Sequence, residues 1–546
     1  MASKLLVVGW DGATFDLLDP WLESGALPNL ARLIDGGIRG PLKSVPNMNS
    51  GPAWTSVSTG LNPGKHGIYG LVGFAENSYR LRPLNATDRR ARALWQQLSD
   101  AGRRVIVVNL PMTYPADRVN GVLVAGGDAP SFQSSGFAHP AQVVDEIRQH
   151  AGDYIVADRI DGLIRDGHKG QALDRLRKMV QSRTRAALYL MDRQDWDLCM
   201  ILFTASDSAQ HYFWQDLAGG GHQDAIRTIF GELDAALGKL RTQAGDGTTT
   251  IVLSDHGFGE HVAANEFLND FLSQLGLLNY RTQRKSQRQI LRRLFAAAER
   301  ALGDRARAWV LERLPRLRGM RSEVLGGIDW ANTRAFNLAG SNQIWINVHG
   351  LYPQGIVAAG GDEYQEVVSL IQGALSGAID PETGRPAVKA VHHRSDLYTG
   401  PYLDQAPDLL VEWSDDPARA GLAWHGPDRE IVAGRRVGYR PFVINGNHRP
   451  LGILAAAGAP FKEAAQVEGA TLYDMAPTIF YLLGHPIPRT LDGRLLETAI
   501  DDRWLEAHPP TFSDREGDGP GGPALALSTE DEDMVMARLR ALGYVE

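Results

Sequence analysis

Residues 49–67 read Asn-Ser-Gly-Pro-Ala-Trp-Thr-Ser-Val-Ser-Thr-Gly-Leu-Asn-Pro-Gly-Lys-His-Gly, and the interpretation of the whole chain depends on this stretch. Pro52 lies where a first helical turn tolerates proline, and Gly60 lies where helices commonly end. The stretch therefore predicts a short helix that begins near Ser50. Backbone N–H groups at that end have no intrahelical acceptor and attract an anion. Serine is also a common N-cap, so this stretch alone fits either a reactive serine at an anion site or an ordinary cap.

The chain has 546 residues, 43% of them hydrophobic, and a formal net charge of −8. This length suits one large α/β domain with insertions, or two or three domains. The negative charge gives no general reason to expect binding of a nucleic-acid polymer. Cys199 is the single cysteine, which excludes an intrachain disulfide and leaves His, Asp, Glu and hydroxyl groups as ligands for any metal. No segment has the length and apolarity of a signal peptide or a transmembrane helix, so we expect a cytoplasmic protein.

Aspartates follow three short apolar runs that are typical of buried parallel strands: Asp11 follows residues 5–8, Asp207 follows 198–203 and Asp255 follows 248–253. Histidines accompany two of them, since His211 is four residues beyond Asp207 and His256 is adjacent to Asp255. Ligands of open parallel sheets bind at the carboxyl ends of the strands. The pattern therefore suggests a metal site, although each acid could instead be an ordinary turn or core residue.

Two regions in the second half differ in composition from the rest. Between residues 281 and 321, thirteen Arg and Lys residues oppose only Glu299, Asp304 and Glu312, within a segment (264–325) that we interpret as a basic helical insertion. Its simplest role is a solvated helical cap or an oligomer contact, and the alternative is a surface for anionic lipid or substrate. Residues 328–440 are expected to form a mixed α/β cap region. Residues 503–528 are expected to be a flexible linker, followed by a C-terminal helix at 529–546.

The ordered motifs resemble those of the alkaline phosphatase superfamily, and most closely its type I phosphodiesterase/nucleotide pyrophosphatase branch. The resemblance covers most of residues 1–500 and rests on Gly-Trp-Asp11-Gly, Ser50 before a helix, Thr59-Gly-x-x-Pro-x-x-His-Gly, Asp207-x-x-x-His211, Ser-Asp255-His256-Gly and Gly-x-His448. It implies a catalytic domain at 1–502 with a three-layer α/β sandwich around a largely parallel sheet. It also implies hydrolysis of a small phosphodiester or pyrophosphate.

The resemblance further implies two divalent metal ions, usually Zn²⁺, with Mn²⁺ also acceptable to such ligands. By position in the motifs, one ion would be held by Asp207, His211 and His448, and the other by Asp11, Asp255, His256 and the Ser50 oxygen. Ser50 would be the nucleophile and would carry a phosphoryl group in a covalent intermediate.

The sequence departs from the family pattern at two positions. Many members use Thr where this chain has Ser50, and they carry a phosphate-binding Asn where this chain has Leu71. Asn49, Lys65 or Tyr114 could supply the missing contact to substrate, although each residue type is more often found on the surface or in packing.

Four alternatives remain open from the sequence. The same site could serve a phosphomonoesterase or a phosphomutase. A sulfatase would need Arg where Trp54 stands, two residues after Pro52. A non-catalytic binding module would be expected to lose a ligand. A homo-oligomer and peripheral membrane contact through the Arg-rich segment also remain open.

Overall fold

The computed structural model describes residues 4–219, 221–281, 327–338, 340–414, 421–434, 444–514 and 527–541. The helical pair expected within 264–325 lies outside the described residues, apart from α11 (Leu268–Gln274). Neither its fold nor its suggested contact with lipid or substrate is therefore tested. Among the described residues, no helix combines the length and apolarity needed to cross a bilayer. The cytoplasmic location stays a prediction.

A ten-stranded sheet forms the centre of the molecule, in the order β19-β2-β18-β9-β1-β8-β5-β6-β7, with β20 also paired to β2. The five strands from β9 to β6 are parallel to one another, whereas β18 and β7 are antiparallel to their neighbours. The strands are β1 (Leu5–Trp10), β2 (Gly37–Lys43), β5 (Val105–Val108), β6 (Gly121–Val124), β7 (Ala138–His139), β8 (Leu198–Phe203), β9 (Thr249–Leu253), β18 (Leu451–Ala457), β19 (Ala465–Gln466) and β20 (Ala470–Thr471).

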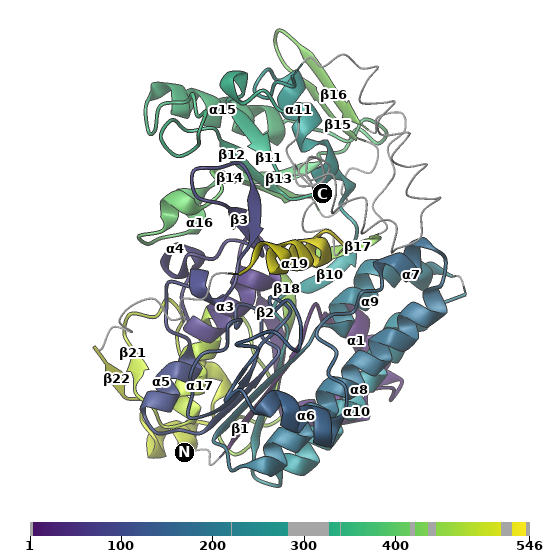
Figure 1. Ribbon diagram of the computed structural model, residues 1–546, viewed down its shortest axis with the longest axis vertical. Helices are drawn as coiled ribbons and strands as arrows, with labels where there is room; N and C mark the ends of the chain where they lie inside the picture. Colours follow the sequence, from purple (N-terminus) through teal and green to yellow (C-terminus); the bar gives the residue numbers. More distant parts are fainter. Residues whose placement is uncertain are drawn as a thin grey trace.

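Helices cover both faces of this sheet (Figure 1). Successive side chains of β1 point to opposite faces: Leu6 and Val8 pack in one hydrophobic cluster, and Leu5 and Val7 pack in another. The first cluster includes α1 (Phe15–Glu23), α2 (Pro28–Asp35), α6 (Val143–Ala151), α7 (Asp161–Arg165), α8 (Lys169–Arg193), α9 (Ala205–Phe213) and α10 (Ala225–Ala244). The second includes α3 (Ser50–Thr59), α5 (Leu94–Asp100) and α17 (Met475–Leu482). This arrangement confirms the predicted three-layer sandwich with a largely parallel central sheet.

A smaller antiparallel sheet lies beyond the carboxyl edge of the central sheet, at the top of Figure 1. It has the order β11-β12-β14-β13 and packs with α11 and α15 around a core of its own. We call this sheet and the elements around it the cap. The cap consists of β11 (Ala335–Asn337), β12 (Gln343–Ile346), α15 (Asp362–Ser376), β13 (Val388–His393), α16 (Arg394–Leu397), β14 (Leu409–Trp413) and the hairpin β15 (Gly421–His425)–β16 (Glu430–Gly434). The hairpin β3 (Val72–Phe74)–β4 (Leu81–Pro83) reaches this cap, and Tyr79 between its strands stacks on Trp330 with ring centroids 3.6 Å apart.

The end of the chain corrects one domain boundary. The predicted linker at 503–528 is wrong for its first part, because α18 (Asp502–Ala507) and β22 (Phe512–Ser513) are ordered, and β22 pairs with β21 (Ile487–Pro488). The predicted C-terminal helix is present as α19 (Thr529–Ala541). Its Val535, Met536 and Leu539 are buried in the cap's hydrophobic cluster, and Figure 1 shows it across the junction between the cap and the central sheet.

Candidate active site

Three buried carboxylates meet at the carboxyl edge of the central sheet. Asp11 follows β1, Asp207 lies in the first turn of α9 directly after β8, and Asp255 follows β9. Because β9, β1 and β8 are adjacent and parallel, their ends lie side by side. Asp255 Oδ1 accepts a hydrogen bond from the Gly12 N–H (3.3 Å), which ties the end of β9 to the turn after β1.

Ser50 is the first residue of α3, as the positions of Pro52 and Gly60 in the sequence predict. The helix is capped by Asn49, whose Oδ1 accepts from the Gly51 N–H (3.1 Å), and it ends at Gly60 with a left-handed φ of 69°. Ser50 Oγ lies 3.4 Å from Asp11 Oδ1 and 3.3 Å from His256 Nε2. The ordinary cap is thus Asn49, and Ser50 instead faces the carboxylates.

Three histidines surround the carboxylates in one common orientation. Each places Nδ1 against a backbone carbonyl: His211 against Gly446 (2.9 Å), His256 against Gly257 (3.0 Å) and His448 against Met48 (2.6 Å). A carbonyl can only accept, so Nδ1 carries the proton and Nε2 of the neutral ring presents a lone pair. His448 enters the site on β17 (Gly446–Arg449), where it is paired with Phe258 of β10 (Gly257–Glu260).

The inward atoms of these residues are arranged as metal ligands. His211 Nε2 and His448 Nε2 lie 3.1 Å apart, and they lie 3.4 and 3.3 Å from Asp207 Oδ1. His256 Nε2 lies 3.3 Å from Asp255 Oδ2 and 3.5 Å from Asp11 Oδ1. Asp207 Oδ1 and Asp255 Oδ2 are buried and accept no hydrogen bond. Facing lone pairs and unpaired buried carboxylate oxygens are unfavourable unless a cation lies between them.

Two compact groups of ligand atoms arise, each with its atoms within 4.8 Å of one another: Asp11, Asp255 and His256, and Asp207, His256 and His448. The first matches the predicted set. The second contains His256 where the sequence predicts His211, although His211 still contacts Asp207 and His448. The oxygen and nitrogen donors fit Zn²⁺ or Mn²⁺.

A family model described as type I phosphodiesterase/nucleotide pyrophosphatase matches residues 5–427. The chain belongs to this family. No curated protein sequence matches the chain. Among solved structures, phosphonoacetate hydrolase from Sinorhizobium meliloti 1021 in complex with phosphonoformate is similar at 14% identity with a TM-score of 0.52, over 88% of this chain and 96% of that one. Human ectonucleotide pyrophosphatase/phosphodiesterase 5 is similar at 14% identity with a TM-score of 0.49, over 91% of this chain and 100% of that one.

Membership of the type I phosphodiesterase family identifies the chain as a metal-dependent phosphoric ester hydrolase. The seven residues predicted as nucleophile and ligands lie together at one edge of the sheet, and they are Asp11, Ser50, Asp207, His211, Asp255, His256 and His448.

The electrostatics of this phosphodiesterase site also favour a bound cation. Burial, followed by the charge of Asp207, raises the pKa of Asp255 to about 7. Burial and the charges of the other two carboxylates raise the pKa of Asp11 well above its usual value. Burial and the nearby His448 hold the pKa of His256 well below 6.5. Without a metal ion, the fold therefore keeps carboxylates together that repel one another when ionised.

We expect metal to change how stability depends on pH. Asp11 and Asp255 have raised folded pKa values, so the folded state binds more protons than the unfolded state above pH 3.8, and their ionisation lowers stability as pH rises. The raised pKa of His211 acts in the same direction above pH 6.5. The lowered pKa values of His256 and His448 oppose this trend only below about pH 6.5.

The melting temperature of the chelated protein should therefore fall between about pH 6.5 and 8.5, and the gain on adding Zn²⁺ or Mn²⁺ should grow with pH. Differential scanning fluorimetry with EDTA or with metal checks this. Equal pH dependence in the two conditions would contradict the metal assignment.

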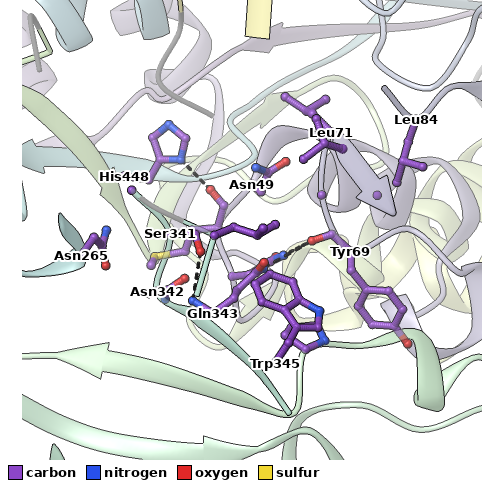
Figure 2. Close-up of a pocket in the computed structure, with 18 of the residues that line it drawn as sticks. Asn49, Tyr69, Leu71, Leu84, Asn265, Ser341, Asn342, Gln343, Trp345 and His448 are labelled. Carbon is purple, nitrogen blue, oxygen red and sulfur yellow. Dashed lines mark hydrogen bonds between the residues drawn. The ribbon is translucent and has the colours of Figure 1, made fainter. Parts of the chain in front are cut away.

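A cavity of about 370 Å³ lies between the metal ligands and the cap. Figure 2 shows His448, Asn49 and Leu71 facing residues of the cap such as Asn342, Gln343 and Trp345. The polar lining combines amides with charged side chains. The amides are Asn47, Asn49, Asn265, Asn342, Gln343, Gln405 and Asn447, and the charged residues are Arg82, Asp88, Arg90 and Asp404. Aromatic side chains supply flat apolar walls, and they are Tyr69, Phe74, Trp345 and Trp413.

The three residues predicted to contact substrate have different positions. Asn49 lines the 370 Å³ cavity. Lys65 does not line this cavity, because α4 (Pro63–His66) directs its Nζ to Asp492 and to the Thr490 carbonyl. Tyr114 does not line it either, because its ring is buried in the core and its hydroxyl donates to the Ser135 carbonyl (2.9 Å).

Proposed function

We propose that this chain hydrolyses a phosphodiester or pyrophosphate bond through a phosphoseryl intermediate on Ser50, with two divalent metal ions, most favourably zinc. The observation that carries the proposal is the geometry around Ser50 Oγ. It lies within 3.4 Å of a buried carboxylate oxygen and an imidazole nitrogen, beside two groups of potential metal ligands. The metal ions would favour the serine alkoxide and neutralise the charge that develops on the reacting phosphate.

Different residues of the chain would supply the nucleophile, the phosphate contacts and the orientation of the metal ligands. Ser50 Oγ attacks phosphorus and displaces the leaving group as an alcohol or a phosphate, at the N-terminal end of α3, where the helix dipole favours the anionic phosphate. The carbonyls of Gly446, Gly257 and Met48 fix the three imidazoles in the tautomer that presents Nε2 to a metal. Water then attacks the phosphoserine, which releases phosphate or a phosphate monoester and regenerates Ser50.

The lining of the 370 Å³ cavity supports a diester or pyrophosphate over a simple monoester. Asn265 Oδ1 accepts from Trp413 Nε1 (2.7 Å), and Asn447 Oδ1 accepts from the His448 N–H (2.8 Å), so their NH₂ groups remain for a ligand. Amides beside aromatic rings suit a planar group with hydrogen-bonding edges, such as a nucleobase. We therefore favour a substrate whose leaving group occupies this cavity.

Metal analysis of the purified protein, followed by paired assays on p-nitrophenyl phosphate and its bis-ester, tests the proposal. We expect about two zinc or manganese ions per chain, faster hydrolysis of the bis-ester, loss of activity with chelator and recovery on adding metal. Faster hydrolysis of the monoester would favour the phosphomonoesterase alternative. Absence of both metal and activity would leave a binding module.

A further inference from the structure

A second cavity, of about 100 Å³, adjoins Ser50 and is walled on one side by α19. It borders Asp11 and Asp207 and extends between the ends of β5 and β6, the segment before α7, helix α8 and the C-terminal helix. Leu71 and Leu84 line both this cavity and the 370 Å³ cavity. The family model ends at residue 427, so α19 and the wall that it forms lie beyond the matched region.

Besides the candidate metal ligand Asp207, four polar side chains that line this cavity are at least nine-tenths buried, and each has one atom without a hydrogen-bond partner. These atoms are Asn109 Oδ1, Asp128 Oδ1, Asp158 Oδ2 and Arg183 Nε. Buried polar atoms rarely lack a partner, because each then loses the hydrogen bonds that it would form with water and gains none in return. Four of them around one cavity indicate that its normal content forms hydrogen bonds.

The rest of each side chain is held in place. Asn109, with a left-handed φ of 67°, donates its amide to the Leu202 carbonyl (2.9 Å). Asp128 Oδ2 accepts from the Tyr114 N–H (2.7 Å), and Asp158 Oδ1 accepts from the Arg159 N–H. Arg183 donates to Thr204 Oγ1 (2.8 Å) and to the Val156 carbonyl (3.0 Å). The unpaired atoms are therefore fixed by the surrounding fold.

Four carboxylates, of Asp11, Asp128, Asp158 and Asp207, and two guanidinium groups, of Arg183 and Arg538, line the cavity. Asp11 and Asp207 belong to the groups of potential metal ligands, which leaves Asp128 and Asp158 beside Arg183 and Arg538. Arg538 of α19 donates to the carbonyls of Gly127, Ala129 and Pro130, and so closes the cavity beside Asp128. A cationic ligand would meet the two guanidinium groups, and an anionic ligand would meet the two carboxylates. Three acceptors and one donor instead suit hydroxyl groups, which donate and accept.

We propose that this cavity is a subsite for a small neutral polyhydroxyl group, of about the size of glycerol, on one ester arm of the substrate. The inference rests on the proposed function, because the cavity opens on Ser50 and its ligand would be joined to the phosphorus that Ser50 attacks. The second arm would then occupy the 370 Å³ cavity. The substrate class is a phosphodiester or pyrophosphate in which a short polyol is esterified on one side.

Two esters with the same leaving group test the subsite on the full-length, metal-loaded protein. Glyceryl p-nitrophenyl phosphate offers hydroxyl groups to the cavity, and propyl p-nitrophenyl phosphate has the same chain length without them. We expect kcat/KM to favour the glyceryl ester by about tenfold or more, because a site with buried polar groups rejects an analogue that leaves them unpaired.

The variants Asp128→Asn and Asp158→Asn keep the shape of each side chain. The Tyr114 and Arg159 N–H groups fix the amide oxygen, so an NH₂ group replaces each unpaired carboxylate oxygen. The double variant should lower the glyceryl-to-propyl ratio about tenfold, through loss of charge-assisted acceptors. Asp174→Ala, at an exposed acid of the same helix as Arg183, is the control and should keep the wild-type ratio.

A wild-type ratio near one would mean that the cavity holds only water, and it would overturn the subsite while the hydrolase proposal stands. An unchanged ratio in the folded double variant would also overturn the subsite. If neither ester is hydrolysed by metal-loaded protein, the proposed function fails, and the subsite fails with it.

Discussion

Replacing Ser50 with alanine should lower kcat for the bis-ester on the order of 10⁴-fold, because the variant has no oxygen that can attack phosphorus. Stability should change little, since the variant removes one hydroxyl and leaves the Asn49 cap of α3 intact. Steady-state assays on saturating metal measure the loss. Mass spectrometry of the rapidly quenched reaction should find a p-nitrophenylphosphoryl group on the peptide that contains Ser50 in the wild type only.

Two further variants make this result specific. Ser58→Ala removes another buried hydroxyl of the same helix, one that donates to the Thr55 carbonyl (2.9 Å), and it should keep wild-type turnover. Ser50→Thr keeps a hydroxyl nucleophile and should keep measurable turnover through the corresponding threonyl p-nitrophenyl phosphodiester. If Ser50→Ala hydrolysed the bis-ester at the wild-type rate, the attacking group would be water and the covalent intermediate would be wrong.

Most residues of the candidate site could be predicted from the sequence because they follow local rules. Asp11, Asp207 and Asp255 follow apolar runs, and parallel neighbouring strands bring their ends together without any knowledge of the loops. Ser50 lies between helix start and stop signals. His448 follows no such rule, and only its place in the ordered family pattern pointed to it. The pairing of β17 with β10 brings His448 into the site.

The surroundings of the site could not be predicted in this way. The amides of the 370 Å³ cavity come from segments as distant as Asn47, Asn265 and Asn342, and packing between the cap and the sheet decides which of them face the cavity. Lys65 is close to Ser50 in the chain, yet the short helix that carries it directs its side chain to Asp492. The sequence indicates that α19 is a helix, but its low amphipathicity gives no sign of the partner that it covers.

Replacing Asp255 with asparagine should abolish metal-dependent turnover and at the same time stabilise the chelated protein. Asp255 is fully buried, and burial together with the charge of Asp207 already disfavours its ionised form. The Gly12 N–H fixes the amide oxygen at the Oδ1 position, so the NH₂ group faces His256 Nε2, which lies 3.3 Å from Asp255 Oδ2. The variant exchanges a repulsive contact for a hydrogen bond and loses an anionic ligand.

We expect the melting temperature in EDTA at about pH 8 to rise by a few degrees, and kcat to fall by on the order of 10³-fold or more with zinc present. Asp234→Asn is the matched control: Asp234 is equally buried, but its two oxygens accept from the Asn29 N–H and side chain and the Leu30 N–H, so the exchange should lower the melting temperature. A buried carboxylate that lowers the free energy of unfolding is expected where it serves as a metal ligand. If Asp255→Asn destabilised the chelated protein as Asp234→Asn does, Asp255 would be an ordinary structural residue.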